Sequence, residues 1–179
     1  MEADLARILD ESYLDRLSAR SVAELRSSRA ECQAVENKLS YLRRLVQGRH
    51  DIVSGEIARR AGGGDPDDFS ELVGKLPDIL SDRIRGPGGG RMPTSFEPGD
   101  IRGELVDRLE ALDEAVPLDA PGSLPDEDLA HAARSLADLE QEVSRLRRTM
   151  FDCIDTIENE LVSRYRAGEA RVDDLLSGH

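Results

Sequence analysis

Five polar positions, spaced along one helical face, occur twice in this chain. The shared spacing is E-x3-S-x2-R-x3-Q/F-x3-D, and the second copy follows the first by 104 residues. At about 100° per residue, the five positions lie within about 80° of one another on a helix, so each copy forms a polar ladder. The first copy is Glu36, Ser40, Arg43, Gln47 and Asp51, and the second is Glu140, Ser144, Arg147, Phe151 and Asp155.

These residue types suit the recognition of a guanine-bearing anion. Arginine offers a planar fork of donors for phosphate or for the O6/N7 edge of guanine. The carboxylates of Glu36 and Asp51 accept hydrogen bonds, and guanine presents N1–H and N2–H2 donors on one edge. Serine and glutamine suit phosphate or ribose oxygens. Because one residue set occurs twice, we expect a ligand with two-fold symmetry, such as a cyclic dinucleotide.

Two long helices must carry these ladders. A capping box, S-x-x-E, at Ser21 and Glu24 begins the first helix, which the sequence predicts over 21–61. Ser123 and Pro125 begin the second, predicted from 125 to about 170–175. The apolar residues of both follow a heptad: Leu25, Cys32, Val35, Leu39, Leu42, Val46 and Val53, then Leu129, Ala132, Leu136, Leu139, Val143, Leu146, Met150, Cys153 and Ile157.

The heptads predict an all-α fold, namely a long antiparallel two-helix coiled-coil hairpin with additional short helices and flexible linkers. Placing the two motif copies side by side predicts that residue i faces about residue 191 − i. Cys32 then faces about residue 159, an offset from Cys153 that disfavours a disulfide.

The chain is expected to divide into four segments. A short N-terminal helix occupies 1–20, with an amphipathic pattern over 2–18, and the first coiled-coil helix occupies 21–61. A Gly/Pro-rich connection spans 62–124 and holds short helices near 68–84 and 101–115. The second coiled-coil helix occupies 125–176.

Composition narrows the class of function. The chain has 179 residues, 34% charged and 3% aromatic, and a net charge of −13. This composition favours long helices over a compact β or Rossmann core, and it lacks the basic footprint of a DNA-binding protein. No apolar stretch predicts a membrane span or a signal peptide, so we expect a cytoplasmic protein. No catalytic or metal-ligand constellation is recognisable, so we expect neither an enzyme nor a metal site.

The repeated ladder resembles the RsiG family of actinobacterial, cyclic-di-GMP-dependent anti-sigma factors. The resemblance covers both long helices, and the first copy matches at all five positions. It implies an antiparallel coiled coil that binds two molecules of cyclic di-GMP and sequesters a WhiG-type (flagellar-type) sigma factor, thereby repressing sporulation genes. Carried over by position, the ligand residues are Glu36, Ser40, Arg43, Gln47, Asp51, Glu140, Ser144, Arg147 and Asp155.

The second copy departs from the pattern at Phe151, which either stacks on a base or packs at the edge of the hairpin. The helices near 2–18 and 101–115 carry apolar faces that dock either on sigma or back on the hairpin. An acidic chain suits a basic surface of a sigma factor. The alternative function is a structural coiled-coil adaptor without a nucleotide ligand, in which the two helices simply share a bias towards charged residues.

Overall fold

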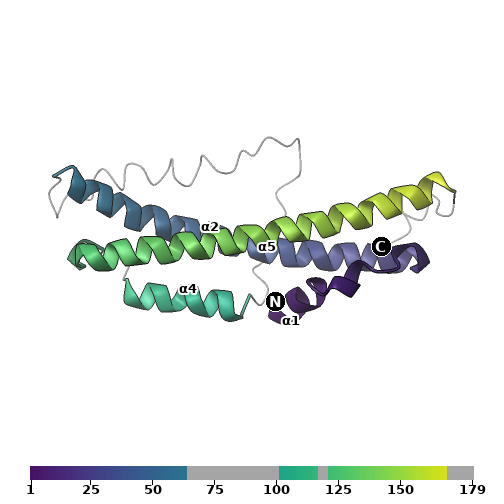
Figure 1. Ribbon diagram of the computed structural model, residues 1–179, viewed down its shortest axis with the longest axis horizontal. Helices are drawn as coiled ribbons and strands as arrows, with labels where there is room; N and C mark the ends of the chain where they lie inside the picture. The colour runs from purple at the N-terminus through teal and green to yellow at the C-terminus, as the bar shows by residue number, and fades with distance from the viewer. Residues whose placement is uncertain (64–100, 117–120, 169–179) are drawn as a thin grey trace, which may run out of the picture. The chain divides into compact units, whose positions relative to one another are not determined.

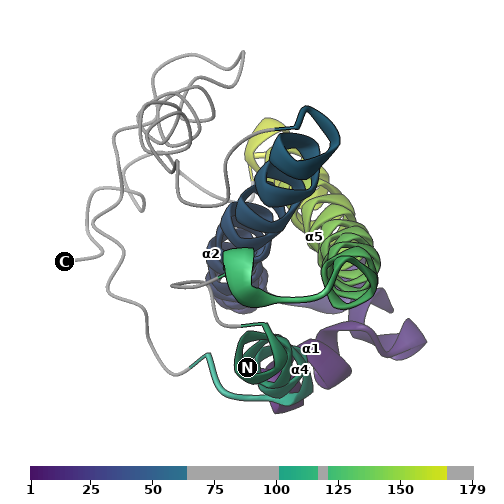
Figure 2. The same ribbon diagram turned by 90° about the vertical axis from the view of Figure 1, so that its left-hand side faces the viewer.

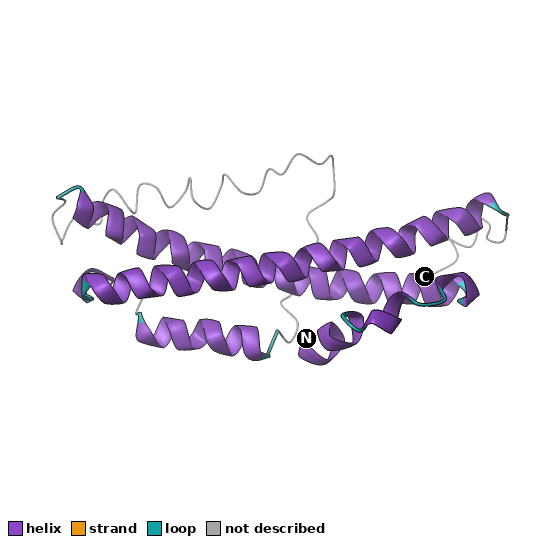
Figure 3. Cartoon of the chain, in the orientation of Figure 1, coloured by secondary structure: helices purple, strands orange, loops and turns teal. Residues whose placement is uncertain are grey.

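A computed structural model describes residues 1–63, 101–116 and 121–168, which are helical apart from short turns and contain no strand (Figures 1 and 3). The all-α prediction is confirmed. The helix expected near 68–84 lies outside the described residues. The α-helices are α1 (Glu2–Ile8), α2 (Val22–Ala61), α4 (Glu104–Ala115) and α5 (Asp126–Arg166), and the 3-10 helices are η1 (Glu11–Leu14), η2 (Leu17–Ala19) and η3 (Pro121–Ser123).

The first long helix, α2, begins where the capping box predicted. The backbone N–H of Glu24 donates to Ser21 Oγ at 3.2 Å, and the N–H of Ser21 donates to the Glu24 carboxylate at 2.6 Å. These reciprocal bonds satisfy two donors that a helix leaves unpaired at its start. The helix ends at Ala61, and Gly63 follows with a φ of +71°, a left-handed conformation that glycine adopts without strain.

The second long helix, α5, starts at Asp126, directly after Pro125, whose carbonyl accepts the N–H of Leu129 at 3.1 Å. It ends at Arg166, earlier than the predicted 170–175. The reason is Gly168, whose φ of +76° is typical of the glycine that terminates a helix.

The N-terminal segment is not the single helix expected over 2–18. The first helix, α1, ends at Ile8, and Asp10 accepts the N–H of Ser12 at 2.9 Å to begin the 3-10 turn η1. A short polar side chain that bonds its own backbone in this way competes with helix continuation. Arg16, with a φ of +51°, interrupts the segment a second time.

The predicted heptad residues form the core of α2 and α5. All of them are buried except Leu146, which is partly exposed. The structure comprises two compact units, one made of 1–40 and 145–179 (unit 1) and the other of 41–144 (unit 2). In unit 1, Arg29 bonds Glu158 and Arg147 bonds Glu36; in unit 2, Arg43 bonds Glu140. Within unit 1, later residues of α2 meet earlier residues of α5, so the segments are antiparallel there.

The cross-helix contacts of the motif residues differ from those predicted. The prediction placed Glu36 opposite Asp155 and Arg43 opposite about residue 148, whereas Glu36 bonds Arg147 and Arg43 bonds Glu140. Matching the two ends of the motif had set one carboxylate against another. The structure instead sets each glutamate against an arginine, which is electrostatically favourable.

Each unit packs an additional helical segment on the long helices. In unit 2, α4 lies beside the long helices (Figure 2). Its Leu105 and Leu109 are buried, and its Arg108 bonds Glu142 of α5 at 2.6 Å. In unit 1, Ile8 of α1 is buried, and Tyr13 Oη donates to Glu31 of α2 at 3.1 Å. The apolar faces of both segments therefore dock back on the long helices. None of the described helices is apolar over a stretch long enough to cross a membrane.

Candidate functional site

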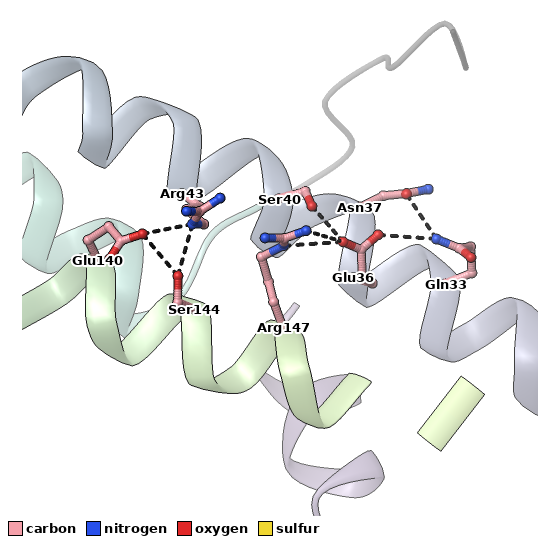
Figure 4. A network of polar contacts seen from close by, with 8 residues as sticks. All are labelled: Gln33, Glu36, Asn37, Ser40, Arg43, Glu140, Ser144 and Arg147. Atoms are coloured by element: carbon pink, nitrogen blue, oxygen red, sulfur yellow. Dashed lines mark hydrogen bonds and ion pairs between the residues drawn. The ribbon is translucent and has the colours of Figure 1, made fainter. Parts of the chain in front are cut away.

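The first copy of the motif contributes a buried carboxylate, Glu36, to unit 1. The residue is 5% exposed. Its Oε1 accepts from Ser40 Oγ at 2.6 Å and from Nε and Nη2 of Arg147 at 3.2 and 3.1 Å. Its Oε2 accepts from Gln33 Nε2 at 3.1 Å (Figure 4). We call Gln33, Glu36, Ser40, Arg147 and Phe151 the first cluster.

The second copy contributes the corresponding carboxylate, Glu140, to unit 2. Its Oε1 accepts from Arg43 Nε at 2.7 Å, from Ser144 Oγ at 2.9 Å and from Gln47 Nε2 at 3.2 Å. Arg43 Nε also donates to Ser144 Oγ at 2.9 Å. Burial raises the pKa of Glu140, but the bonds from Arg43 and Ser144 outweigh that effect, and the net pKa is lowered. We call Arg43, Gln47, Glu140 and Ser144 the second cluster.

The two clusters are built reciprocally. The first cluster takes its Glu and Ser from α2 and its Arg from α5, whereas the second takes its Glu and Ser from α5 and its Arg from α2. This exchange follows from antiparallel pairing of two copies of one motif. The structure thus joins seven of the predicted site residues into two similar sets of contacts: Glu36, Ser40, Arg43, Gln47, Glu140, Ser144 and Arg147.

The two motif aspartates are placed differently. Asp51 is half-buried beside His50, with 4.0 Å between its Oδ1 and the Nδ1 of the imidazole. Asp155 is exposed on α5, and the structure gives it no ion pair within the described part of the chain. The structure therefore does not join Asp155 to the first cluster.

Phe151, which replaces the motif glutamine, lies partly exposed beside Arg147. Its side chain is 38% exposed, and the guanidinium carbon of Arg147 lies 5.4 Å from the centroid of its ring. This distance is typical of a cation–π contact. Phe151 thus contacts the arginine that bonds Glu36.

Gln33 is the cluster residue that the sequence prediction missed. It lies three residues before Glu36 on α2, a spacing that places two side chains next to each other on a helix. Its counterpart in the second copy is Ala137, so the repeat itself gave no signal for it. The helical spacing of an amide and a carboxylate was the only available indication.

Both clusters consist of polar contacts between side chains that are each able to bind a polar ligand instead. Among the described residues, no group of three His, Cys, Asp or Glu side chains could hold a metal ion. Each cluster instead has one arginine, which a phosphate can bind, and one glutamate, which an N–H donor can bind. Chemically, such an arrangement suits a ligand that is anionic at one edge and rich in N–H donors at another.

Comparison with known proteins is informative over the first long helix. A family model described as RsiG-like matches residues 11–80, which include all of α2 and the first copy of the motif. No curated protein matches the chain. The matched range contains the site residues Glu36, Ser40, Arg43, Gln47 and Asp51. Over residues 11–80, the chain is similar to the RsiG-like family.

Proposed function

We propose that this protein is an anti-sigma factor that binds cyclic di-GMP and sequesters a WhiG-type sigma factor, thereby repressing sporulation genes. The match of residues 11–80 to the RsiG-like family model supports the anti-sigma role. The cyclic di-GMP ligand, two molecules per chain, is inferred from the motif and from the chemistry of the two clusters. The acidic balance of the chain, a net charge of −13, suits a basic surface of the sigma factor.

Ligand binding proceeds by an exchange of partners. A phosphate of the ligand takes the guanidinium of Arg147 or Arg43, and the N1–H and N2–H2 donors of a guanine take the carboxylate of Glu36 or Glu140. Each charged group therefore keeps a partner of opposite polarity throughout. This matters most for Glu36, because an unpaired charge at a buried position is strongly destabilising.

The observation that carries the proposal is the reciprocal make-up of the clusters. Each one combines residues of both motif copies and of both long helices. A ligand at either cluster therefore contacts α2 and α5 together and stabilises their pairing. A ligand that binds the paired helices better than any other arrangement shifts the chain towards that arrangement, and with it the surface offered to sigma.

Calorimetric titration of cyclic di-GMP tests the proposal. We expect about two ligands per chain for the wild type, and loss of binding in the double variant Arg43→Ala/Arg147→Ala. The matched control is Arg44→Ala/Arg148→Ala, which removes the same charge from exposed positions one residue along. Absence of binding by the wild type would reject the ligand and favour a structural coiled-coil adaptor.

A second titration tests the gating of sigma. The affinity for a flagellar-type sigma factor should be higher with saturating cyclic di-GMP than without it. Equal sigma affinity under both conditions refutes gating, whatever the mode of ligand binding.

A further inference from the structure

The two clusters differ at the fourth position of the motif. In the second cluster, the amide of Gln47 donates to Glu140 at 3.2 Å. In the first cluster, the equivalent residue is Phe151, which has no group that can donate to Glu36. The motif residues alone therefore give Glu36 in the first cluster one hydrogen-bond donor fewer than Glu140 has in the second.

Gln33 supplies that donor from a different direction. Its Nε2 donates to Glu36 Oε2 at 3.1 Å and to Asn37 Oδ1 at 3.2 Å (Figure 4). The bond to Asn37 fixes which end of the amide faces Glu36, because Nε2 serves both acceptors. The carboxylates of Glu36 and Glu140 consequently each receive one guanidinium, one hydroxyl and one amide.

Phe151 performs a separate task in the first cluster. Its ring lies against the guanidinium of Arg147, and Arg147 also bonds Glu36. A planar guanidinium stacked on a ring keeps few orientations, so its N–H groups stay directed along the cluster. The second cluster shows no such ring among the described residues; Gln47 occupies that position.

We propose that Gln33 replaces the missing motif glutamine and that Phe151 is a positioning residue for Arg147, so that the first cluster is a complete ligand half-site built from a different residue set. This assignment rests on the proposed function. It names the residues that recognise the guanine-bearing anion where the motif is broken.

A mutant cycle tests the replacement. In titrations with cyclic di-GMP, Gln33→Ala should weaken binding about 3- to 10-fold, as expected for the typical net contribution of one hydrogen bond, and Gln47→Ala should do the same. In a Phe151→Gln background, which restores the motif, Gln33→Ala should change the affinity less than about 2-fold. Gln141→Ala, at an exposed position on α5, is the matched control.

Three further variants separate the roles of Gln33 and Phe151 from simple packing. Gln33→Met keeps the length of the side chain without its donor, so it should behave as Gln33→Ala does. Phe151→Tyr should retain the wild-type affinity, whereas Phe151→Leu should lose about 3-fold or more because it removes the ring that holds Arg147. Wild-type affinity of Phe151→Leu, an aliphatic replacement, would mean that the residue only fills space.

The outcomes are distinguishable. If Gln33→Ala matches the Gln141→Ala control, or if its effect is the same with Phe and Gln at position 151, the assignment is overturned while cyclic di-GMP binding stands. If the wild type does not bind cyclic di-GMP, the proposed function fails and the assignment fails with it. Thermal melting of each variant by circular dichroism establishes that the helices are intact.

Discussion

Removal of Arg147 should destabilise the protein more than removal of Arg43, although both are the arginine of the same motif. Arg147 pairs with Glu36, whose side chain is 7% exposed, whereas Arg43 is 34% exposed and pairs with Glu140, whose side chain is 24% exposed. Water solvates a carboxylate that loses its partner near the surface, but solvates a buried one poorly. The cost of the substitution should therefore follow the burial of the glutamate left behind.

The magnitude can be estimated from the contacts. Arg147→Met leaves Glu36 with two neutral donors, Ser40 and Gln33, and also removes the stacking on Phe151. Loss of one charge-assisted bond to a buried group and of one exposed cation–π contact gives about 2 kcal/mol. For Arg43→Met, solvent screening reduces the cost to about 1 kcal/mol.

Chemical denaturation measures this difference. Unfolding in urea at pH 7 without added nucleotide, followed by circular dichroism, gives the free energy of unfolding of each variant. In thermal melts, Arg147→Met should lower Tm by about 4–8 °C, since about 1 kcal/mol corresponds to 2–4 °C for a chain of this size. Adding Glu36→Gln to Arg147→Met should recover part of the loss, because a neutral amide replaces the stranded charge.

Two results would refute this reasoning. One is an equal or larger loss for Arg43→Met than for Arg147→Met. The other is the absence of any recovery in Glu36→Gln/Arg147→Met, which would mean that the cost lies in packing rather than in an unpaired carboxylate.

Three further predictions concern acid stability and the ends of the helices. The pKa values of Glu56 and Glu140 are lowered. For Glu56 the cause is the bonds from its neighbouring arginines, and for Glu140 the bonds from Arg43 and Ser144 outweigh the effect of burial. The stabilisation that these two ionised carboxylates give is therefore complete above the ordinary glutamate pKa and is lost as the pH falls through their lower pKa values in the folded protein. The urea midpoint should drop below about pH 4.5, and it should drop less in Glu140→Gln. An identical drop in the wild type and in Glu140→Gln contradicts the lowered pKa of Glu140. Tyr13→Phe removes the bonds from the tyrosine hydroxyl to Ser28 and Glu31 of α2, so the free energy of unfolding in urea should fall by about 1 kcal/mol. An unchanged urea midpoint would contradict this. Arg60→Ala removes the contacts with Asp126 and with the carbonyls of Pro121 and Gly122, so amide hydrogen exchange should accelerate at 121–128 and stay unchanged near the C-terminal end of α5.

The features that could be predicted from the sequence are those that depend on local periodicity. The seam from Leu25 to Val53 is buried as the heptad requires, and α2 begins at the capping box of Ser21 and Glu24. An apolar stripe follows from the helical spacing of neighbouring residues, and the pairing of free N–H groups at a helix start depends on the few residues around it. The repeat likewise identified Glu36 and Arg147, because the same spacing of polar residues can be recognised in the sequences of both helices.

The features that could not be predicted depend on how segments distant in sequence meet. Register is one of them, since the motif alone does not say whether Glu36 faces Asp155 or Arg147, and only the charges of the paired helices decide it. Gln33 is another. Its bond to Glu36 matters because Phe151, on the other helix, lacks the donor that a glutamine would offer. The break after Ile8 depends on a single bond from Asp10, which weighs little in a periodic pattern.

The charge of the two clusters limits how they can attract a ligand. Each has one arginine and one glutamate, so neither is strongly positive, and the whole chain carries a net charge of −13. A cyclic dinucleotide carries two phosphates, and long-range attraction towards such a protein is weak or adverse. Under the proposed function, recognition must therefore come from short-range exchange, in which Arg147 and Arg43 pass from a carboxylate to a phosphate and the freed carboxylates accept guanine donors. A ligand that offers phosphate without guanine would leave Glu36 buried with only the neutral donors Ser40 and Gln33, and that penalty would discriminate in favour of a guanine nucleotide.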